Sequence, residues 1–209
     1  MASPAIAAQP AKIRILARIE RFRPGKTFAA KDFLDIASRG MVDVTLASLA
    51  RSAKIRRIRR GLYDIPKRNQ ALGGILSPDI DEAARTLARR YRWKIVPEGA
   101  WAANLLGIST QVPAKIVYLS DGPATKIQIG KRNIHFKHAR PQALAGSAGV
   151  PGLAIQALRY LGKDAVNRRL ISRLRRILSE ADRRKLVRAT RFGVDWIYET
   201  AGKIAGESA

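Results

Sequence analysis

Residues 27–65, TFAAKDFLDIASRGMVDVTLASLARSAKIRRIRRGLYDI, decide the fold. The pattern predicts a short helix from Phe28 to Ala37, a turn at residues 38–40, a second helix from about Val44 to Ser52, and a basic hairpin over residues 54–65. This order of elements is typical of a winged helix-turn-helix.

The second helix is predicted to have one apolar and one polar face. We expect Asp43 to cap its N-terminus. Apolar residues recur at helical spacing on the buried side: Leu46, Leu49, Ala50 and Ala53. The other side carries Thr45, Ser48, Arg51 and Ser52. Two interpretations are open from the helix alone: an ordinary solvated face, or a recognition helix in the major groove with Arg51 reaching guanine.

The hairpin favours the second interpretation. Ile55 and Ile58 are set against Leu62 and Ile65 across a tight turn, where Gly61 supplies the positive φ that the turn needs. Like charges crowd one end of the hairpin: Arg56, Arg57, Arg59 and Arg60. Such a cluster suits a wing that lies along a polyanion. Tyr63 is expected to pack under the hairpin rather than contact sugar.

Composition agrees with a polyanionic partner. The 209 residues carry 40 Lys and Arg against 16 Asp and Glu, a formal net charge of +24. This excess favours DNA, RNA or an anionic membrane as partner. Cysteine is absent, which excludes disulfides, thiol nucleophiles and Cys-based metal sites. No secretory signal and no apolar run of membrane-spanning length are present, so a soluble cytoplasmic protein is expected.

The predicted fold class is α+β, with an N-terminal winged helix-turn-helix followed by a mixed α+β domain. We expect a disordered tail at 1–10, the DNA-binding domain at 11–66, a linker at 67–78 and a second domain at 79–209. Within the first domain, a helix from Ala11 to Arg23 precedes a short strand at Lys26–Phe28 that pairs with the wing.

The second domain is expected to open with a helix that Ser77 caps and that runs to Tyr91, with first-turn acids complementing its dipole rather than binding a metal. A small antiparallel sheet should occupy about residues 93–138. Helices are predicted at about 153–161, 165–178 and 179–204. Trp196, Ile197 and Tyr198 are interpreted as core residues.

The predicted C-terminal helices carry a long run of cations: Arg168, Arg169, Arg173, Arg175, Arg176, Arg183, Arg184, Lys185, Arg188 and Arg191. A run of this kind usually marks a solvated face. Because few acids balance it, a second surface for nucleic acid or an acidic partner is an equal alternative.

Nothing in the sequence indicates catalysis. His135 and His138 are three residues apart in a strand, so their side chains point to opposite faces and do not form a metal pair. Glu98-Gly99 at a strand-to-helix junction could bind a small ligand, although a simple turn is the better interpretation. We therefore expect no enzyme, no metal and no cofactor.

Three segments resemble one known family. They are VPEGAWAANLLG at 96–107, STQVP at 109–113 and KIVYLSDG at 115–122. They are similar to the second domain of AbiEi-type antitoxins of abortive-infection toxin–antitoxin systems. The hairpin at 130–138 and the RGLY at 60–63 fit the same family. One departure is Ala29, at a position where such a domain often has a capping Ser or Thr.

The resemblance implies a transcriptional repressor and antitoxin. Its N-terminal winged helix would bind inverted repeats in operator DNA, with residues 43–52 as recognition helix and 55–65 as wing. Its C-terminal domain would counter a nucleotidyltransferase-like toxin, by direct contact or indirectly. No exposed apolar helix announces a dimer, so a monomer or weak dimer that binds DNA cooperatively is expected.

The candidate DNA-contacting residues are Lys26, Thr27, Lys31, Thr45, Ser48, Arg51, Ser52, Lys54, Arg56, Arg57, Arg59 and Arg60. The alternative function is that of an RNA- or ribosome-associated basic protein, because net charge does not distinguish DNA from RNA.

Overall fold

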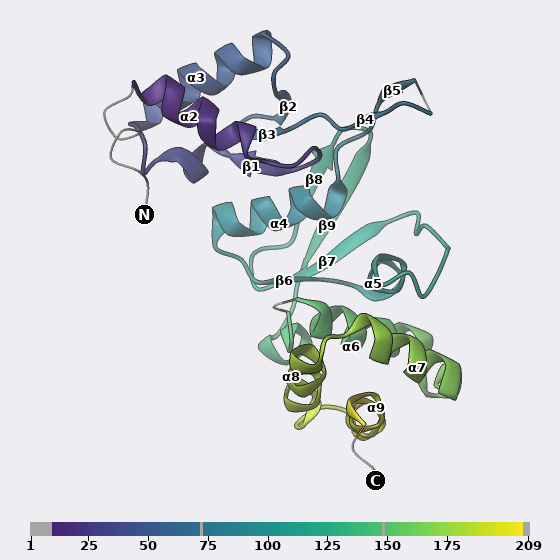
Figure 1. Ribbon diagram of the computed structural model, residues 1–209. Helices are drawn as coiled ribbons and strands as arrows, with labels where there is room; N and C mark the ends of the chain where they lie inside the picture. The colour runs from purple at the N-terminus through teal and green to yellow at the C-terminus, as the bar shows by residue number, and fades with distance from the viewer. Residues whose placement is uncertain (1–9, 72, 148, 207–209) are drawn as a thin grey trace. The chain divides into compact units, whose positions relative to one another are not determined.

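The computed structural model describes residues 10–71, 73–147 and 149–206, and it is a mixed α+β structure (Figure 1). The expected tail at 1–10 lies, apart from Pro10, outside the described residues. The chain forms two compact units. The first unit consists of residues 1–92 with the hairpin tip 128–132, and the second unit consists of residues 93–127 and 133–209.

The first unit combines helices with a small sheet. Its elements are α2 (Ala11–Glu20), β1 (Thr27–Ala29), the 3₁₀ helix η1 (Ala30–Phe33), α3 (Arg39–Arg51), β2 (Arg56–Arg59), β3 (Leu62–Asp64), β4 (Arg68–Asn69), β5 (Gly74–Ile75) and α4 (Ile80–Tyr91). β1, β3 and β2 form an antiparallel sheet in that order, and β4 pairs with β5. The predicted pairing of the first strand with the hairpin is confirmed.

An aromatic cluster joins this sheet to α2 and α3. Phe28 lies opposite Tyr63 in the register of β1 and β3, and the two rings stack with centroids 6.1 Å apart. Phe33 meets Phe28 edge to face. Ile15 from α2 and Leu46 from α3 complete the buried cluster. Tyr63 is therefore a core residue, as expected, because its ring fills space that two helices and a sheet enclose.

The helix predicted from Ala11 begins there, but the two predicted helices of the helix-turn-helix begin elsewhere. The segment expected to be helical from Phe28 starts as strand β1, because its backbone pairs with β3. The carboxylate of Asp32 then accepts from the Ala29 N–H at 2.9 Å and starts η1. α3 begins at Arg39, so Asp43 is not its cap. Asp43 instead pairs with Arg39 one turn earlier, at 2.8 Å.

The predicted hairpin turn is confirmed. Gly61 has φ +72° between β2 and β3, the left-handed region that glycine enters without strain. The register shifts between Arg57 and Arg59, which makes a bulge in β2. Arg56 holds the far end of the hairpin, since its guanidinium donates to the fully buried carboxylate of Asp64 at 2.5 and 3.0 Å.

The helix that was expected to open the second domain, α4, belongs to the first unit instead. α4 packs against β1. The N-cap of α4 is Asp79, which accepts from the Glu82 N–H at 3.1 Å, so the prediction of Ser77 as cap is wrong. The expected linker contains the β4–β5 pair.

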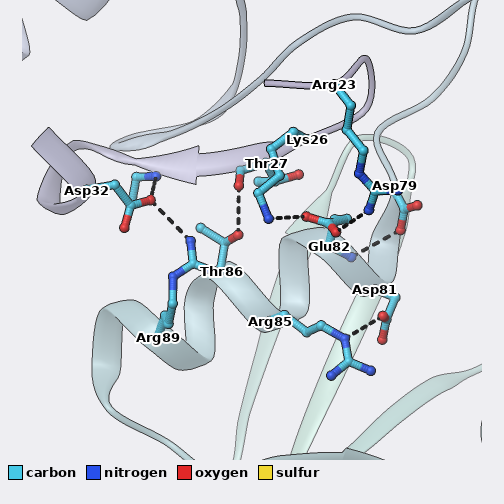
Figure 2. Close-up of polar contacts among 11 residues, drawn as sticks. Arg23, Lys26, Thr27, Asp32, Asp79, Asp81, Glu82, Arg85, Thr86 and Arg89 are labelled. Atoms are coloured by element: carbon cyan, nitrogen blue, oxygen red, sulfur yellow. Dashed lines mark hydrogen bonds and ion pairs between the residues drawn. The ribbon is translucent and has the colours of Figure 1, made fainter. Parts of the chain in front are cut away.

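Polar contacts join α4 to β1 and to the residues just before and after it (Figure 2). The Thr86 hydroxyl donates to the Thr27 carbonyl at 3.0 Å in a buried position. Glu82 accepts from Lys26 at 3.0 Å and from Arg23 at 2.8 Å. Near the other end of the helix, Arg89 donates to Asp32 at 3.1 Å.

The sheet of the second unit is mixed rather than antiparallel. Its strands are β6 (Ile95–Pro97), β7 (Ile116–Ser120), β8 (Thr125–Ile129) and β9 (Arg132–His138), in the order β6-β7-β9-β8. β6 and β7 are antiparallel, whereas β7 and β9 are parallel. The predicted neighbours β8 and β9 are confirmed, and their hairpin places β9 in the middle of the sheet.

Helices make up the remainder of the second unit. They are α5 (Gly99–Leu105), η2 (Pro141–Leu144), α6 (Val150–Leu161), η3 (Lys163–Ala165), α7 (Arg168–Ile177), α8 (Glu180–Thr190) and α9 (Asp195–Ala205). α5 and α6 approach closely through alanines, and leucines of α6, α7 and α8 surround Ile197 and Ile204 of α9.

The long helix expected at 179–204 is two helices, because the chain turns at 191–194. The Thr190 hydroxyl donates back to the Leu186 and Val187 carbonyls, and the Gly193 N–H donates to the Thr190 carbonyl. Ile197 is buried as expected, but Tyr198 is 41% exposed and is not a core residue.

Glu82→Gln should destabilise the first unit in a pH-dependent way. Burial raises the pKa of Glu82, but the hydrogen bonds and charges of Lys26 and Arg23 outweigh it and hold the pKa below its ordinary value of 4.5. The carboxylate therefore stabilises the fold above that value, and this contribution disappears as pH falls through the lowered folded-state pKa. At neutral pH we expect the free energy of unfolding to drop by about 1–3 kcal/mol.

Denaturant unfolding from about pH 7 down to about pH 3 measures this effect. Glu20→Gln is the matched control, because Glu20 is an exposed acid on α2. A Glu82→Gln penalty that stays constant across this range would contradict the assignment.

Arg56→Ala should destabilise the fold much more than Arg57→Ala. Removing Arg56 leaves the Asp64 carboxylate, which is 0% exposed, buried without its counter-charge. Breaking such a pair costs about 3–5 kcal/mol, whereas an exposed substitution changes stability by about 0.5 kcal/mol or less. Urea unfolding of both variants tests this, and equal losses would show that the pair does not hold the hairpin.

Candidate nucleic-acid interface

The outer face of α3 is short, largely uncharged and partly apolar. Val44 is 66% exposed and Met41 is 49% exposed, which is unusual for residues of this type. Arg51 is exposed at the last turn of the helix. The one carboxylate on this face, Asp43, is already paired with Arg39. A face of this kind can approach a base-pair edge, and apolar side chains can contact a thymine methyl group.

Sequence reasoning was right about Arg51 on this face and wrong about Thr45. Thr45 is 3% exposed and points into the core, so its expected outward position is wrong. The helix begins at Arg39, earlier than predicted, and its exposed face includes Met41 and Val44, which were not among the predicted contact residues. Ser48 is half-buried, and the Ser52 hydroxyl donates to the Leu49 carbonyl at 3.1 Å.

Four cations next to α3 carry unopposed charge, and we call them the hairpin cations: Lys54, Arg57, Arg59 and Arg60. Arg59 is half-buried and the other three are exposed. Within the described residues, none of the four forms an ion pair with an acid. Guanidinium groups without an acidic partner can bind phosphate oxygens.

Four other predicted contact residues serve the fold instead. Lys26 is held by Glu82, and the Thr27 backbone and side chain are buried against α4. Lys31 donates to the Arg90 carbonyl at 3.0 Å, although its side chain remains exposed. Arg56 belongs to the Asp64 pair.

α4 brings to the hairpin a residue that sequence reasoning did not place there. The Arg90 guanidinium donates to the Arg60 carbonyl at 3.3 Å and lies within 3.0 Å of where a Cβ on Gly61 would be. Arg90 therefore supports the tip of the hairpin. Only the tertiary contact of α4 with this unit reveals it, because Arg90 is 30 residues away from Arg60 in sequence.

The acids of the first unit are mostly used internally. Ion pairs hold Asp32, Asp35, Asp43, Asp64 and Glu82. The hydrogen bond from Arg18 lowers the pKa of Asp35 and keeps it ionised. Since these carboxylates already have cationic partners, the positive charge around the hairpin is left uncompensated.

The basic residues of the second unit are divided between two helices. Arg168, Arg169, Arg173, Arg175 and Arg176 are exposed on α7, and Arg184, Lys185 and Arg188 are exposed on α8. Some have internal roles: Arg173 donates to the Gly107 carbonyl and Arg184 to Glu180. Arg183 is half-buried with its Nε buried. Both interpretations of this run therefore stay open.

No metal centre is found in the described residues, where no group of three His, Asp or Glu side chains could hold an ion. His138 Nδ1 lies 3.0 Å from the Gly122 carbonyl.

A pocket of about 530 Å³ opens beside the Glu98-Gly99 junction in the second unit. Across the described helices, none is both long and apolar enough to cross a membrane.

Comparison with known proteins gives a family and a distant structure. No curated protein matches the chain. The crystal structure of the RV2827C protein from Mycobacterium tuberculosis is similar over 99% of this chain and 81% of that one, with 15% sequence identity and a TM-score of 0.41. Residues 14–186 match a family described as a family of unknown function, DUF6088. Because this match spans most of the sequence, the chain belongs to DUF6088.

Proposed function

We propose that the first unit is a winged helix-turn-helix that binds duplex DNA, and that the protein is a transcriptional repressor and antitoxin of a toxin–antitoxin operon. In this proposal α3 enters the major groove and the β2–β3 hairpin is the wing. The protein acts in the cytoplasm without chemistry of its own. It binds inverted repeats upstream of its own gene and counters a nucleotidyltransferase-like toxin.

The observation that carries the DNA-binding part is the outer face of α3 beside the hairpin cations. Arg51 ends α3, and the chain returns through Lys54, whose N–H donates to the Leu49 carbonyl at 3.1 Å. The largely uncharged outer face of α3 and the hairpin cations therefore follow one another in the chain, and this backbone hydrogen bond joins the two segments. The outer face of α3 would contact base edges, and the hairpin cations would bind phosphates.

The antitoxin part rests on the sequence resemblance in residues 96–122. Those residues form β6, α5 and β7 of the second unit. The resemblance supports a role for this unit in countering the toxin, by contact or indirectly. A monomer or weak dimer that binds cooperatively to two repeats fits the proposal.

RNA or ribosome binding is the second candidate. The exposed arginines of α7 and α8 favour it, because most of them have no acidic partner within the described residues. Charge of this kind binds either nucleic acid, so only competition separates the two functions.

A mobility shift on the DNA upstream of the gene tests the proposal. At about 150 mM salt, wild-type protein should retain its shift against scrambled duplex and structured RNA. Arg51→Ala should weaken operator binding by about 1–3 kcal/mol and relax base preference. The control is Arg21→Ala, which removes an exposed cation from the end of α2. Loss of the shift to any polyanion would contradict a sequence-specific repressor, and a stronger effect of RNA would favour the second candidate.

Changing Arg59 and Arg60 together to alanine should weaken binding to all duplexes alike. Removing each phosphate contact should reduce the slope of log K against log salt by about one. Titration of operator and scrambled duplex at several salt concentrations measures both quantities. Lys12→Ala with Arg21→Ala removes the same charge from α2 and should leave the slope nearer to wild type. An unchanged slope in the hairpin variant would mean that this segment is no wing.

A further inference from the structure

The pocket of about 530 Å³ in the second unit is independent of the proposed DNA interface. It lies between the junction of β6 and α5, the strand β7, and the C-terminal half of α6. Its volume falls within the range of about 300–1,000 Å³ that is usual for small-molecule sites. Six of its lining residues bear on what it binds: Glu98, Trp101, Lys115, Gln156, Arg159 and Tyr160.

Gln156 is the most informative of these residues. It is 3% exposed, although it sits in a helix whose buried side is otherwise apolar. Its amide nitrogen donates to the Ala143 carbonyl at 2.9 Å. That bond fixes the orientation of the amide, since a carbonyl can only accept. Among the described residues no donor reaches the Gln156 Oε1, so an acceptor of fixed orientation lines the pocket and is available to a ligand.

Glu98 adds a second acceptor. Its carboxylate lines the same pocket and receives a long contact of 3.4 Å from Lys137, which leaves one oxygen available. Two acceptors on the wall of a pocket match a ligand edge that carries N–H donors. The amino groups of adenine, guanine and cytosine provide such an edge.

Aromatic surface forms the next part of the site. Tyr160 is 48% exposed and its ring lies against Gly99, where an added Cβ would be 3.5 Å from Tyr160 Cδ2. Trp101 presents only its ring, because its indole N–H already donates to the Tyr118 hydroxyl at 2.9 Å. Such ring faces stack on planar bases.

Two exposed cations also line the pocket. They are Lys115, which directly precedes β7, and Arg159, which lies on α6. In the part of the chain that the structure describes, neither is paired with an acid. They suit the phosphate of a ligand whose planar part stacks on the aromatic residues.

We propose that this pocket binds a nucleotide, with an amino-bearing base between Tyr160 and the acceptors Gln156 and Glu98, and with its phosphate at Lys115 and Arg159. The nucleotide is either free or an unpaired residue of a single strand, since both present the same groups. Uracil fits less well because it has no amino group to offer to two acceptors. The site stands whether or not α3 reads DNA.

Calorimetric titration of the full chain tests the proposal with AMP, GMP, CMP and UMP. Ribose 5-phosphate is the control for simple attraction of anions to a basic protein. At least one amino-bearing nucleotide should bind about tenfold or more tightly than ribose 5-phosphate, which is the equivalent of one stacked base, and UMP should bind more weakly than that nucleotide. Equal binding of nucleotides and ribose 5-phosphate would overturn the proposal.

Matched variants locate the binding. Tyr160→Ala should lower the affinity about tenfold, and Tyr160→Phe should retain it because the ring is kept. Tyr198→Ala is the control, since Tyr198 is a similarly exposed tyrosine on α9 outside the pocket. Lys115→Ala should weaken binding more than Lys126→Ala, which removes an exposed cation from β8. If Tyr198→Ala matched Tyr160→Ala, the nucleotide would be bound elsewhere and the proposal would be wrong.

A short single-stranded oligonucleotide and its duplex distinguish the two sources. Oligonucleotide binding that free nucleotide displaces and that Tyr160→Ala weakens would identify an unpaired residue of a strand. Nucleotide binding that the oligonucleotide does not displace would identify a free nucleotide. If Tyr160→Ala changes the affinity for neither the free nucleotide nor the oligonucleotide, the pocket is not a nucleotide site.

Discussion

The buried hydrogen bond from Thr86 to the Thr27 carbonyl marks the contact on which the first unit depends. A sheet of three strands with three or four residues each is marginal by itself, and it needs cover to persist. α2 and α3 bury Phe28 and Tyr63, while α4 packs on β1 and is tied to it by Glu82 and Thr86. The helix therefore completes the sheet that carries the hairpin.

Docking α4 also decides which charges are free. A protein with a net charge of +24 is destabilised by its own repulsion unless its few acids are placed well. In the first unit they are matched to cations near the sheet, such as Glu82 with Lys26 and Asp64 with Arg56. The hairpin cations have no such match within the described residues. The separation of internal and outward charge follows from packing and is not visible in the composition.

The sequence was sufficient where local chemistry decides the structure. Gly61 between two apolar segments predicts the hairpin turn, and the short strand expected before the first helix of the motif does pair with the hairpin. Sequence reasoning failed where a remote partner decides. Asp43 looks like a helix cap, but Arg39 takes its carboxylate, and α4 resembles the start of a second domain until β1 is seen to bind it. Likewise, periodicity reveals β7, β8 and β9 but not that β9 lies between the other two. The pocket at Glu98 depends on Gln156, which lies far along the chain on α6, so a turn was the reasonable interpretation from sequence.

Charge and shape have different consequences for what this protein can distinguish. The hairpin cations and the arginines of α7 and α8 attract any polyanion. They can therefore add affinity and salt dependence, but not selectivity between partners. Selectivity requires surfaces that fit one partner and reject others. The described chain offers two: the outer face of α3, where Met41 and Val44 are exposed without an unpaired carboxylate, and the pocket where Gln156 holds a fixed acceptor. In the two proposals, selectivity therefore depends on side chains other than the hairpin cations and the arginines of α7 and α8.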